Sequence, residues 1–282
     1  MSVFPFLECS LPRDYEEELP TLLYGLPTLG CELGRYIGET VELRVYLDPV
    51  YADAEASLRR ALAAAGAEDI AVHGLEEKDW LEAYRGVTRP FSVGRTWWMD
   101  PHPDRPTPAP DGRIRLAVEP RMAFGTGSHE TTQLVLMELE ELPVRGGTVL
   151  DVGSGSGILS LAALALGARW AVGVEIDAQA VWVARQIAAQ QELPLRPAFV
   201  VGEVAVLDSV RFDVVLCNMI ADHFLPILPT LQQRLDGGGR AVLSGILDSQ
   251  VEGVCTAAER CGFRVCGGRN LKEWASLLLE RA

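Results

Sequence analysis

Two glycine-rich turns lie close together in the middle of the chain. The first is MAFGTGSHETT, residues 122–132, and the second is DVGSGSG, residues 151–157. Glycine adopts backbone conformations that other residues avoid, and it lets a ligand come close to the main chain. Because Asp151 follows Thr132 by only nineteen residues, we expect both turns to serve a single ligand.

The second turn indicates what kind of ligand this is. It follows the apolar strand TVL and opens a helix, which is where doubly wound sheets bind nucleosides. The dinucleotide pattern GxGxxG, counted from Gly153 through Gly155, requires a glycine where the chain has Ile158. Asp151 ends the strand and would repel a pyrophosphate. A ligand with no phosphate and a cationic end suits this turn better, and S-adenosylmethionine is such a ligand.

Two polar residues end later strands. Glu175 ends VGVE, twenty-two residues beyond Gly153, where an acidic side chain accepts the hydroxyls of a bound ribose. Asn218 ends FDVVLCN, where it would overlook the methyl group of a bound cofactor. The alternatives are a solvated charge for Glu175 and a helix N-cap for Asn218. Asp177 is expected to begin the next helix as its N-cap.

The elements that must position these residues form an alternating series after about residue 130. Short apolar strands such as TVLDVG, AVGVEID and DVVLCN are separated by helical segments. Apolar strands that alternate with helices predict a parallel sheet covered on both faces. We therefore predict a catalytic, cofactor-binding domain over residues 121–282, with a doubly wound α/β sheet whose last strands are antiparallel at the edge.

The front of the chain has a different pattern. Residues 1–75 read as strand–helix–strand–strand–helix–strand, a ferredoxin-like α+β arrangement. Its third strand alternates Val41, Leu43, Val45 and Leu47 on one face. We assign residues 76–120 to a connector, which begins with a helix over EEKDWLEAYR and contains five prolines in PHPDRPTPAP.

Composition and charge limit the partners and the compartment. The net charge is −14, which argues against nucleic acid because such a partner requires a basic protein face. Residues 1–75 carry thirteen acidic side chains and five arginines, which suits either a basic protein partner or ordinary solubility.

No signal peptide or membrane-spanning segment is expected, since the start turns acidic and the apolar stretches are short. Six cysteines without a CxxC pair and only four histidines indicate reduced thiols, no metal site and a cytoplasmic protein. We expect a monomer.

Five segments together resemble a known family: FGTGSHETT, VLDVGSGSGILSLAALALGA, VGVEID, VVLCNMIAD and LSGIL. They look like the methyltransferases of ribosomal large-subunit protein eleven, the PrmA family, and the resemblance covers nearly the whole chain. The FGTGxHxTT element makes it specific, since other methyltransferases share only the glycine turn and the acidic strand end. The implied fold is a class I S-adenosylmethionine-dependent methyltransferase domain behind a ferredoxin-like substrate-recognition module.

The resemblance also implies the site. The cofactor ligands fall on Thr132, Gly153, Glu175 and Asn218, and the first glycine turn folds over the methionine end of S-adenosylmethionine. In that turn we include three further cofactor-binding residues, Phe124, Gly125 and Thr126. The chain departs from the family at Glu175, where aspartate is more common, and at Met219-Ile220, where isoleucine or leucine is usual.

The implied reaction is repeated methylation of lysine side chains and of an N-terminal amine of the ribosomal protein. Asn218 is expected to orient the amine, and His129, Glu119 and His223 are candidate proton acceptors, with His129 better suited to shaping the loop. Two other classes remain open. One is a methyltransferase for a small molecule or an RNA base, and the other is a nicotinamide oxidoreductase or a binding module without activity.

Overall fold

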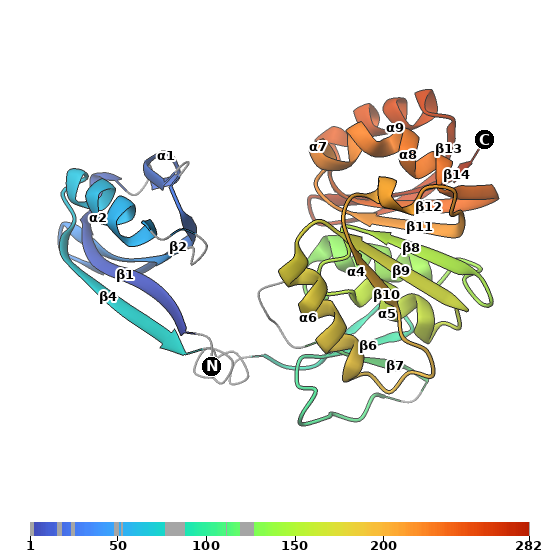
Figure 1. The fold of residues 1–282 in the computed structure, drawn as a ribbon, viewed down its shortest axis with the longest axis horizontal. Helices are drawn as coiled ribbons and strands as arrows, with labels where there is room; N and C mark the ends of the chain where they lie inside the picture. Colours follow the sequence, from blue (N-terminus) through green and yellow to red (C-terminus); the bar gives the residue numbers. More distant parts are fainter. Residues whose placement is uncertain are drawn as a thin grey trace. The chain divides into compact units, whose positions relative to one another are not determined.

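The chain divides into two compact units, Met1–Val87 and Thr88–Ala282 (Figure 1). The computed structural model describes residues 3–15, 19–23, 26–47, 51, 53–76, 88–110, 112–118 and 127–281. The helix expected over residues 76–85 falls outside these residues except for Glu76, which ends a strand, and the part of the first glycine turn before Gly127 also lies outside them. None of the described helices has the length and apolar character needed to cross a membrane.

The first unit has the element order that the sequence predicts. Its elements are β1 (Val3–Pro12), α1 (Leu19–Leu23), β2 (Thr28–Ile37), β3 (Thr40–Leu47), α2 (Ala54–Ala64) and β4 (Glu68–Glu76). A short 3-10 turn, Arg13–Tyr15, follows β1. The strands form one sheet in the order β2-β3-β1-β4, and each neighbouring pair is antiparallel.

Alternation along the strands builds the core of this unit. The residues 41, 43, 45 and 47 of β3 are all buried, as the sequence predicts, and they share a core with Leu7 and Leu11 of β1. Helix α2 covers that face with Leu58 and Leu62, which lie one turn apart. The other face of the sheet keeps polar side chains such as Glu8 and Arg44, which form an ion pair with a 2.7 Å Nε–Oε2 distance.

The second unit is built on a seven-stranded sheet. Its strands are β8 (Thr148–Val152), β9 (Trp170–Glu175), β10 (Ala198–Val201), β11 (Phe212–Asn218), β12 (Leu235–Leu247), β13 (Phe263–Leu271) and β14 (Trp274–Arg281). The order is β10-β9-β8-β11-β12-β14-β13, in which the first five strands are parallel and the last two run antiparallel to their neighbours. The strand order reverses between β8 and β11, which is the switch point where such sheets bind ligands.

Helices cover both faces of this sheet, as predicted (Figure 1). They are α4 (Glu130–Leu139), α5 (Ile158–Ala165), α6 (Ala178–Ala189), α7 (Ala221–Phe224), α8 (Leu228–Gln233) and α9 (Val251–Arg260), with 3-10 turns at Val204–Leu207, Leu225–Ile227 and Asp248–Gln250. Val149 joins the core under α4, α5 and α6, whereas Leu150 joins the core under α7, α8 and α9. Adjacent residues of one strand therefore supply two separate cores.

Residues 88–118 belong to this second unit, although the sequence placed them in a connector that ends at residue 120. They form a three-stranded sheet of β5 (Phe91–Val93), β6 (Trp97–Asp100) and β7 (Ile114–Ala117). Trp97 is fully buried, and its indole nitrogen donates to the Leu136 carbonyl oxygen at 2.9 Å. The proline-rich stretch is anchored because the buried Asp100 carboxylate accepts hydrogen bonds from the His102 and Thr107 amides.

Prolines prevent this stretch from forming helix or inner strand, but they do not prevent it from packing as a fixed loop. Arg115 adds a 2.8 Å ion pair to the same Asp100 carboxylate. The unit boundary therefore lies near Thr88 and not at residue 121.

Candidate active site

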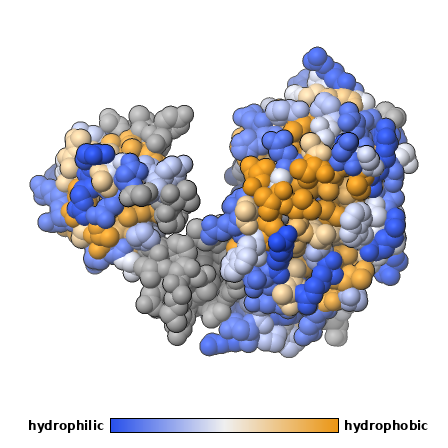
Figure 2. Space-filling model, viewed as in Figure 1, coloured by the Kyte–Doolittle hydropathy of each residue, from blue (hydrophilic) through white to orange (hydrophobic). Residues whose placement is uncertain are grey.

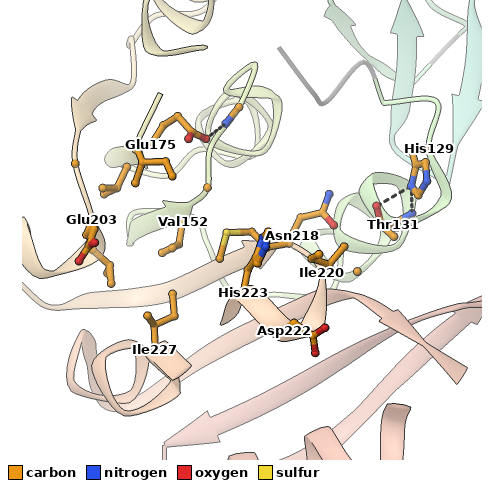
Figure 3. A pocket seen from close by; sticks show the side chains of 18 of the residues that line it. His129, Thr131, Val152, Glu175, Glu203, Asn218, Ile220, Asp222, His223 and Ile227 are labelled. Carbon is orange, nitrogen blue, oxygen red and sulfur yellow. Dashed lines mark hydrogen bonds between the residues drawn. The ribbon is translucent and has the colours of Figure 1, made fainter. Parts of the chain in front are cut away.

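A cavity of about 820 Å³ opens where β8, β9 and β11 end (Figure 3). Parallel strands bring their carboxyl ends to one edge of the sheet, so the residues that follow each strand converge there. Asn218 lies near the middle of the lining, with Glu175 and Glu203 on one side of it and His129 and Thr131 on the other (Figure 3). The cavity is therefore elongated along the sheet edge.

The second glycine turn forms part of the cavity wall between β8 and α5. Gly153, Gly155 and Gly157 all have left-handed backbone angles, with φ of +68°, +49° and +78°. A Cβ atom on Gly153 would lie 2.6 Å from the sulfur of Met219, so a side chain there would displace Met219 and would also strain the backbone at its positive φ. Gly153 and Gly155 line the cavity.

Glu175 is held by the backbone on both sides. Its Oε2 accepts a hydrogen bond from the Gly155 amide at 3.1 Å, and its Oε1 accepts one from the Asp177 amide at 3.2 Å. Each carboxylate oxygen has two acceptor positions, so both oxygens can still accept hydrogen bonds from a ligand in the cavity. Asp177 caps α6 as expected, since its side chain accepts from the Gln179 amide at 2.8 Å.

Asp151, which the sequence predicts to face the ligand, is 1% exposed and is not among the residues that line the cavity. The two residues that follow it, Val152 and Gly153, do line the cavity. The Oδ2 of Asp151 accepts from the Ser160 amide at 3.0 Å and from the Ser160 hydroxyl at 2.8 Å, in the first turn of α5. The other oxygen has no hydrogen-bond partner among the described residues.

Burial sets the acidity of this group. Desolvation raises the pKa of Asp151 to about 6, although the two hydrogen bonds from Ser160 lower it, and the nearby Glu175 charge raises it further. Above pH 6 the site therefore holds a buried negative charge with one unsatisfied oxygen. Such an oxygen attracts a cationic group and repels a phosphate.

Asn218 and Thr132 act as a pair. The side-chain nitrogen of Asn218 donates to the Thr132 hydroxyl at 3.2 Å. Thr132 is completely buried and does not line the cavity, whereas Asn218 does. The hydrogen bond to Thr132 fixes the orientation of the amide, and the carbonyl oxygen of Asn218 can accept a hydrogen bond from a ligand.

His129 shapes the start of α4, as the sequence suggested. It is the N-cap of α4, and its Nδ1 accepts a 3.3 Å hydrogen bond from the Thr131 amide. The Thr131 hydroxyl lies 2.8 Å from the same nitrogen. Both residues line the cavity. Phe124, Gly125 and Thr126, and the candidate proton acceptor Glu119, lie outside the described residues.

Several lining residues were not predicted from the sequence. Ile176 directly follows Glu175 and Ile220 lies two residues after Asn218, and they are 73% and 51% exposed although they are large and apolar. Exposed apolar side chains at a cavity are typical of a ligand site. The rule that parallel strands end at one edge of the sheet predicted Glu175 and Asn218, and it applies equally to the residues just after them. Further lining residues that were not predicted include Glu203, Val204, Asp222, Ile227, Gly245 and Trp274.

Apolar residues are also plentiful on the surface of this unit, where they gather over the middle of the large sheet in the view of Figure 2.

Trp274 had no local signal in the sequence. It reaches the cavity from β14, which pairs with β12 at Leu247↔Trp274. This placement depends on the antiparallel edge of the sheet.

The chain is similar to a family of known proteins. The family model "Ribosomal protein L11 methyltransferase (PrmA)" matches residues 34–282. The ribosomal protein L11 methyltransferase of Pelobacter propionicus is 39% identical over 215 residues, which are 74% of this chain and 68% of that protein. That of Symbiobacterium thermophilum is 37% identical over 209 residues, 72% of this chain and 66% of that protein.

The matched stretches thus span about two thirds of these relatives' own length. Among solved structures, the ribosomal protein L11 methylase of Lactobacillus delbrueckii subsp. bulgaricus superposes with a TM-score of 0.64 at 27% identity. The match covers 69% of this chain and 99% of that one. The chain belongs to the ribosomal protein L11 methyltransferase (PrmA) family.

Proposed function

We propose that this protein transfers methyl groups from S-adenosylmethionine to amino groups of ribosomal protein L11, namely lysine side chains and the N-terminal amine. One observation supports this most directly. A single cavity joins a glycine turn, a carboxylate with free acceptor positions and an amide oxygen that is fixed in place. These are the groups that a nucleoside with a reactive methyl and an incoming amine require.

The cavity fits S-adenosylmethionine better than a dinucleotide. The chain has Ile158 where the dinucleotide pattern requires its third glycine, and the negative charge of Asp151, which directly precedes the lining residues Val152 and Gly153, favours a ligand with a positive charge. Glu175 would accept the ribose hydroxyls, and Ile176 and Val204 would contact the base. The bound cofactor supplies an activated methyl group on its sulfonium sulfur.

Asn218 would orient the attacking amine. A lysine has a pKa of about 10.4, so the neutral form costs about 4–5 kcal/mol at pH 7. The Asn218 oxygen can accept a hydrogen bond from an N–H of that neutral amine and so direct the lone pair of the amine nitrogen toward the methyl group of the bound cofactor. Positioning of this kind supplies a large part of the rate. Of the candidate proton acceptors, His223 is exposed at the cavity, whereas the Nδ1 of His129 is used in the cap of α4.

The first unit is a ferredoxin-like module that would recognise the substrate. Its strand order and the net charge of −8 over residues 1–75 support this role, because a strongly negative surface attracts a basic protein. The face of its sheet opposite the helices presents Glu8 and Glu32 around Arg44. All six cysteines are free thiols, which suits the reducing cytoplasm that we propose as the compartment of this enzyme.

A methyltransferase that acts on a small-molecule or RNA amine is the alternative, and two measurements separate it from the proposal. Calorimetric titration should give binding of S-adenosylmethionine and none of NAD. Purified L11 incubated with enzyme and cofactor should then gain one or more methyl groups per modified amine, as seen by mass spectrometry. Methylation of free lysine or of RNA at the same rate as L11 would instead favour the alternative. Binding of NAD without binding of S-adenosylmethionine would exclude both methyltransferase functions.

A further inference from the structure

The turn between β13 and β14 delivers an aromatic side chain to the cavity. The two strands pair as far as Leu271↔Trp274, so Lys272 and Glu273 form the turn and Trp274 begins β14. Trp274 is half-buried and lines the cavity. Among the described lining residues it is the only tryptophan, tyrosine or phenylalanine.

Trp274 packs against the side chain that begins α4. The rings of His129 and Trp274 have centroids 5.4 Å apart and meet edge to face at 62°. The His129 ring is itself held by Thr131. Trp274 therefore lies at the end of the cavity that His129 occupies in Figure 3, on the opposite side of Asn218 from Glu175.

An ion pair holds the turn in this place. The Nζ of Lys272 pairs with the Glu130 carboxylate. Glu130 directly follows His129, and Lys272 lies two residues before Trp274. Lys272 has a left-handed φ of +53°, as two-residue hairpin turns require. The Asp248 amide also donates to the Glu273 carbonyl oxygen at 3.0 Å. The turn is thus tied to α4 and to the end of β12.

We propose that Trp274 is the wall that receives the substrate amine and its methylated forms, and that the Lys272–Glu130 ion pair positions it. Each methyl group replaces an N–H donor but leaves the positive charge of the protonated amine, so Asn218 loses hydrogen bonds as methylation proceeds. An aromatic face attracts a methylated ammonium without any donor. This wall therefore keeps partly methylated amines in the site for another round.

The inference rests on the proposed function and is tested by the methylation states of the product. We expect Trp274→Ala to reduce kcat/KM for dimethylated more than for unmodified lysine, by roughly 2- to 30-fold, so that partly methylated L11 accumulates. Trp274→Phe should retain most of the preference, and the affinity for S-adenosylmethionine should be unchanged in both. Trp182→Ala is the matched control, because Trp182 is exposed on α6 and does not line the cavity. An unchanged ratio of methylation states in Trp274→Ala would refute the wall.

The ion pair is tested separately, because Lys272 and Glu130 act through Trp274. Lys272→Ala should shift the methylation states in the same direction as Trp274→Ala but less, and Lys272→Arg should restore them. If Lys272→Ala leaves them unchanged while Trp274→Ala shifts them, the positioning role is wrong.

Binding of trimethyllysine distinguishes this inference from the proposed function. Calorimetry on the enzyme saturated with S-adenosylhomocysteine should detect binding that Trp274→Ala abolishes. If L11 is not a substrate but this binding depends on Trp274, the wall stands and the proposed substrate is wrong. If L11 is methylated but trimethyllysine binds wild type and Trp274→Ala equally, the proposed function stands and the wall does not.

Discussion

Hydrogen bonds within the protein fix the orientation of the two polar side chains, Glu175 and Asn218, that are proposed to contact ligands in the cavity. Glu175 is held by two backbone amides, and Asn218 is held by the Thr132 hydroxyl. A group fixed in this way loses little further freedom when a ligand binds, so its hydrogen bonds contribute more to affinity or rate. Substitutions at these residues should therefore separate cofactor binding from turnover.

Replacing Glu175 with alanine should weaken the binding of S-adenosylmethionine by about 1.5–3 kcal/mol, the range for hydrogen bonds to a charged group. Glu175→Gln should have a smaller effect, because it retains one acceptor oxygen. Calorimetric titration measures both, with Glu192→Ala as a control on an exposed residue that does not line the cavity. Unchanged affinity in a folded Glu175→Ala protein would remove this residue from the cofactor site.

Asn218→Ala should lower kcat by roughly 10- to 100-fold and change cofactor affinity much less, because its oxygen is proposed to orient the amine. Thr132→Val keeps the shape of the buried side chain but removes the hydroxyl that holds Asn218, so it should lower kcat in the same direction. Steady-state kinetics with saturating cofactor gives both values. Normal turnover combined with weak cofactor binding would make Asn218 a simple cofactor ligand.

The buried Asp151 should make stability depend on pH in an uncommon direction. Its pKa is raised in the folded state to about 6, from 3.8, so between pH 4 and pH 6 the folded protein binds the proton more tightly than the unfolded chain. The stability from this group is therefore present below pH 4 and is lost as pH rises through 6. The loss is on the order of 3 kcal/mol.

Asp151→Asn cannot ionise and should not show this loss. The free energy of unfolding of Asp151→Asn minus that of wild type, measured by urea titration, should increase from pH 4 to pH 6 and level off above pH 7. Parallel pH profiles for the two proteins would mean that Asp151 is not desolvated in the fold.

At the scale of the elements, the ends of β11 and β12 approach each other closely beside the cavity. Gly245 in β12 has φ of +86°, and a Cβ atom there would lie 2.2 Å from the Met219 carbonyl oxygen. This neighbour is backbone and cannot rotate away. The glycine therefore lets the chain after Asn218 pass over β12.

Gly245→Ala should displace Met219 and reduce stability by roughly 1–3 kcal/mol, together with kcat. Gly253→Ala is the matched control in α9, where an added Cβ meets nothing within 4 Å. Alanine in a helix interior should raise stability by up to about 1 kcal/mol. Urea unfolding and initial rates check both, and a Gly245→Ala protein with normal stability and rate would contradict this reading of the close approach.

At the scale of the whole molecule, we propose that one unit binds the cofactor and the other captures the substrate protein. The cavity and all its described lining residues belong to Thr88–Ala282, whereas the acidic surface with net charge −8 belongs to residues 1–75. A negative surface accelerates encounter with a basic protein, and salt screens this attraction. Substrate capture and cofactor binding should therefore respond to different changes.

A protein of residues 88–282 should bind S-adenosylmethionine nearly as the full chain does, which also reports that it is folded, but it should not methylate L11. In the full chain, the association rate with L11 should fall as salt rises, and Glu8→Gln with Glu32→Gln should weaken that dependence. Methylation of L11 by residues 88–282 at the full-length rate would show that the first unit is not the recognition element.

The sequence by itself determined the features that depend on short segments. Alternation along β3, the glycine turn after β8 and the polar residues at the ends of β9 and β11 were all predicted, because strand periodicity and left-handed turns are set by a few adjacent residues. The rule that parallel strands end at one edge then brought Glu175 and Asn218 to a common site.

Only the tertiary structure decided which neighbouring side chains face the cavity and which are buried. Thr132 meets Asn218 across 86 residues of sequence, and Lys272 meets Glu130 across 142. Asp151 is buried and accepts hydrogen bonds from Ser160, and the proline-rich stretch packs around Asp100. These outcomes depend on pairing and packing between distant segments, where burial is decided by what the rest of the chain places opposite each residue, and no local pattern records that.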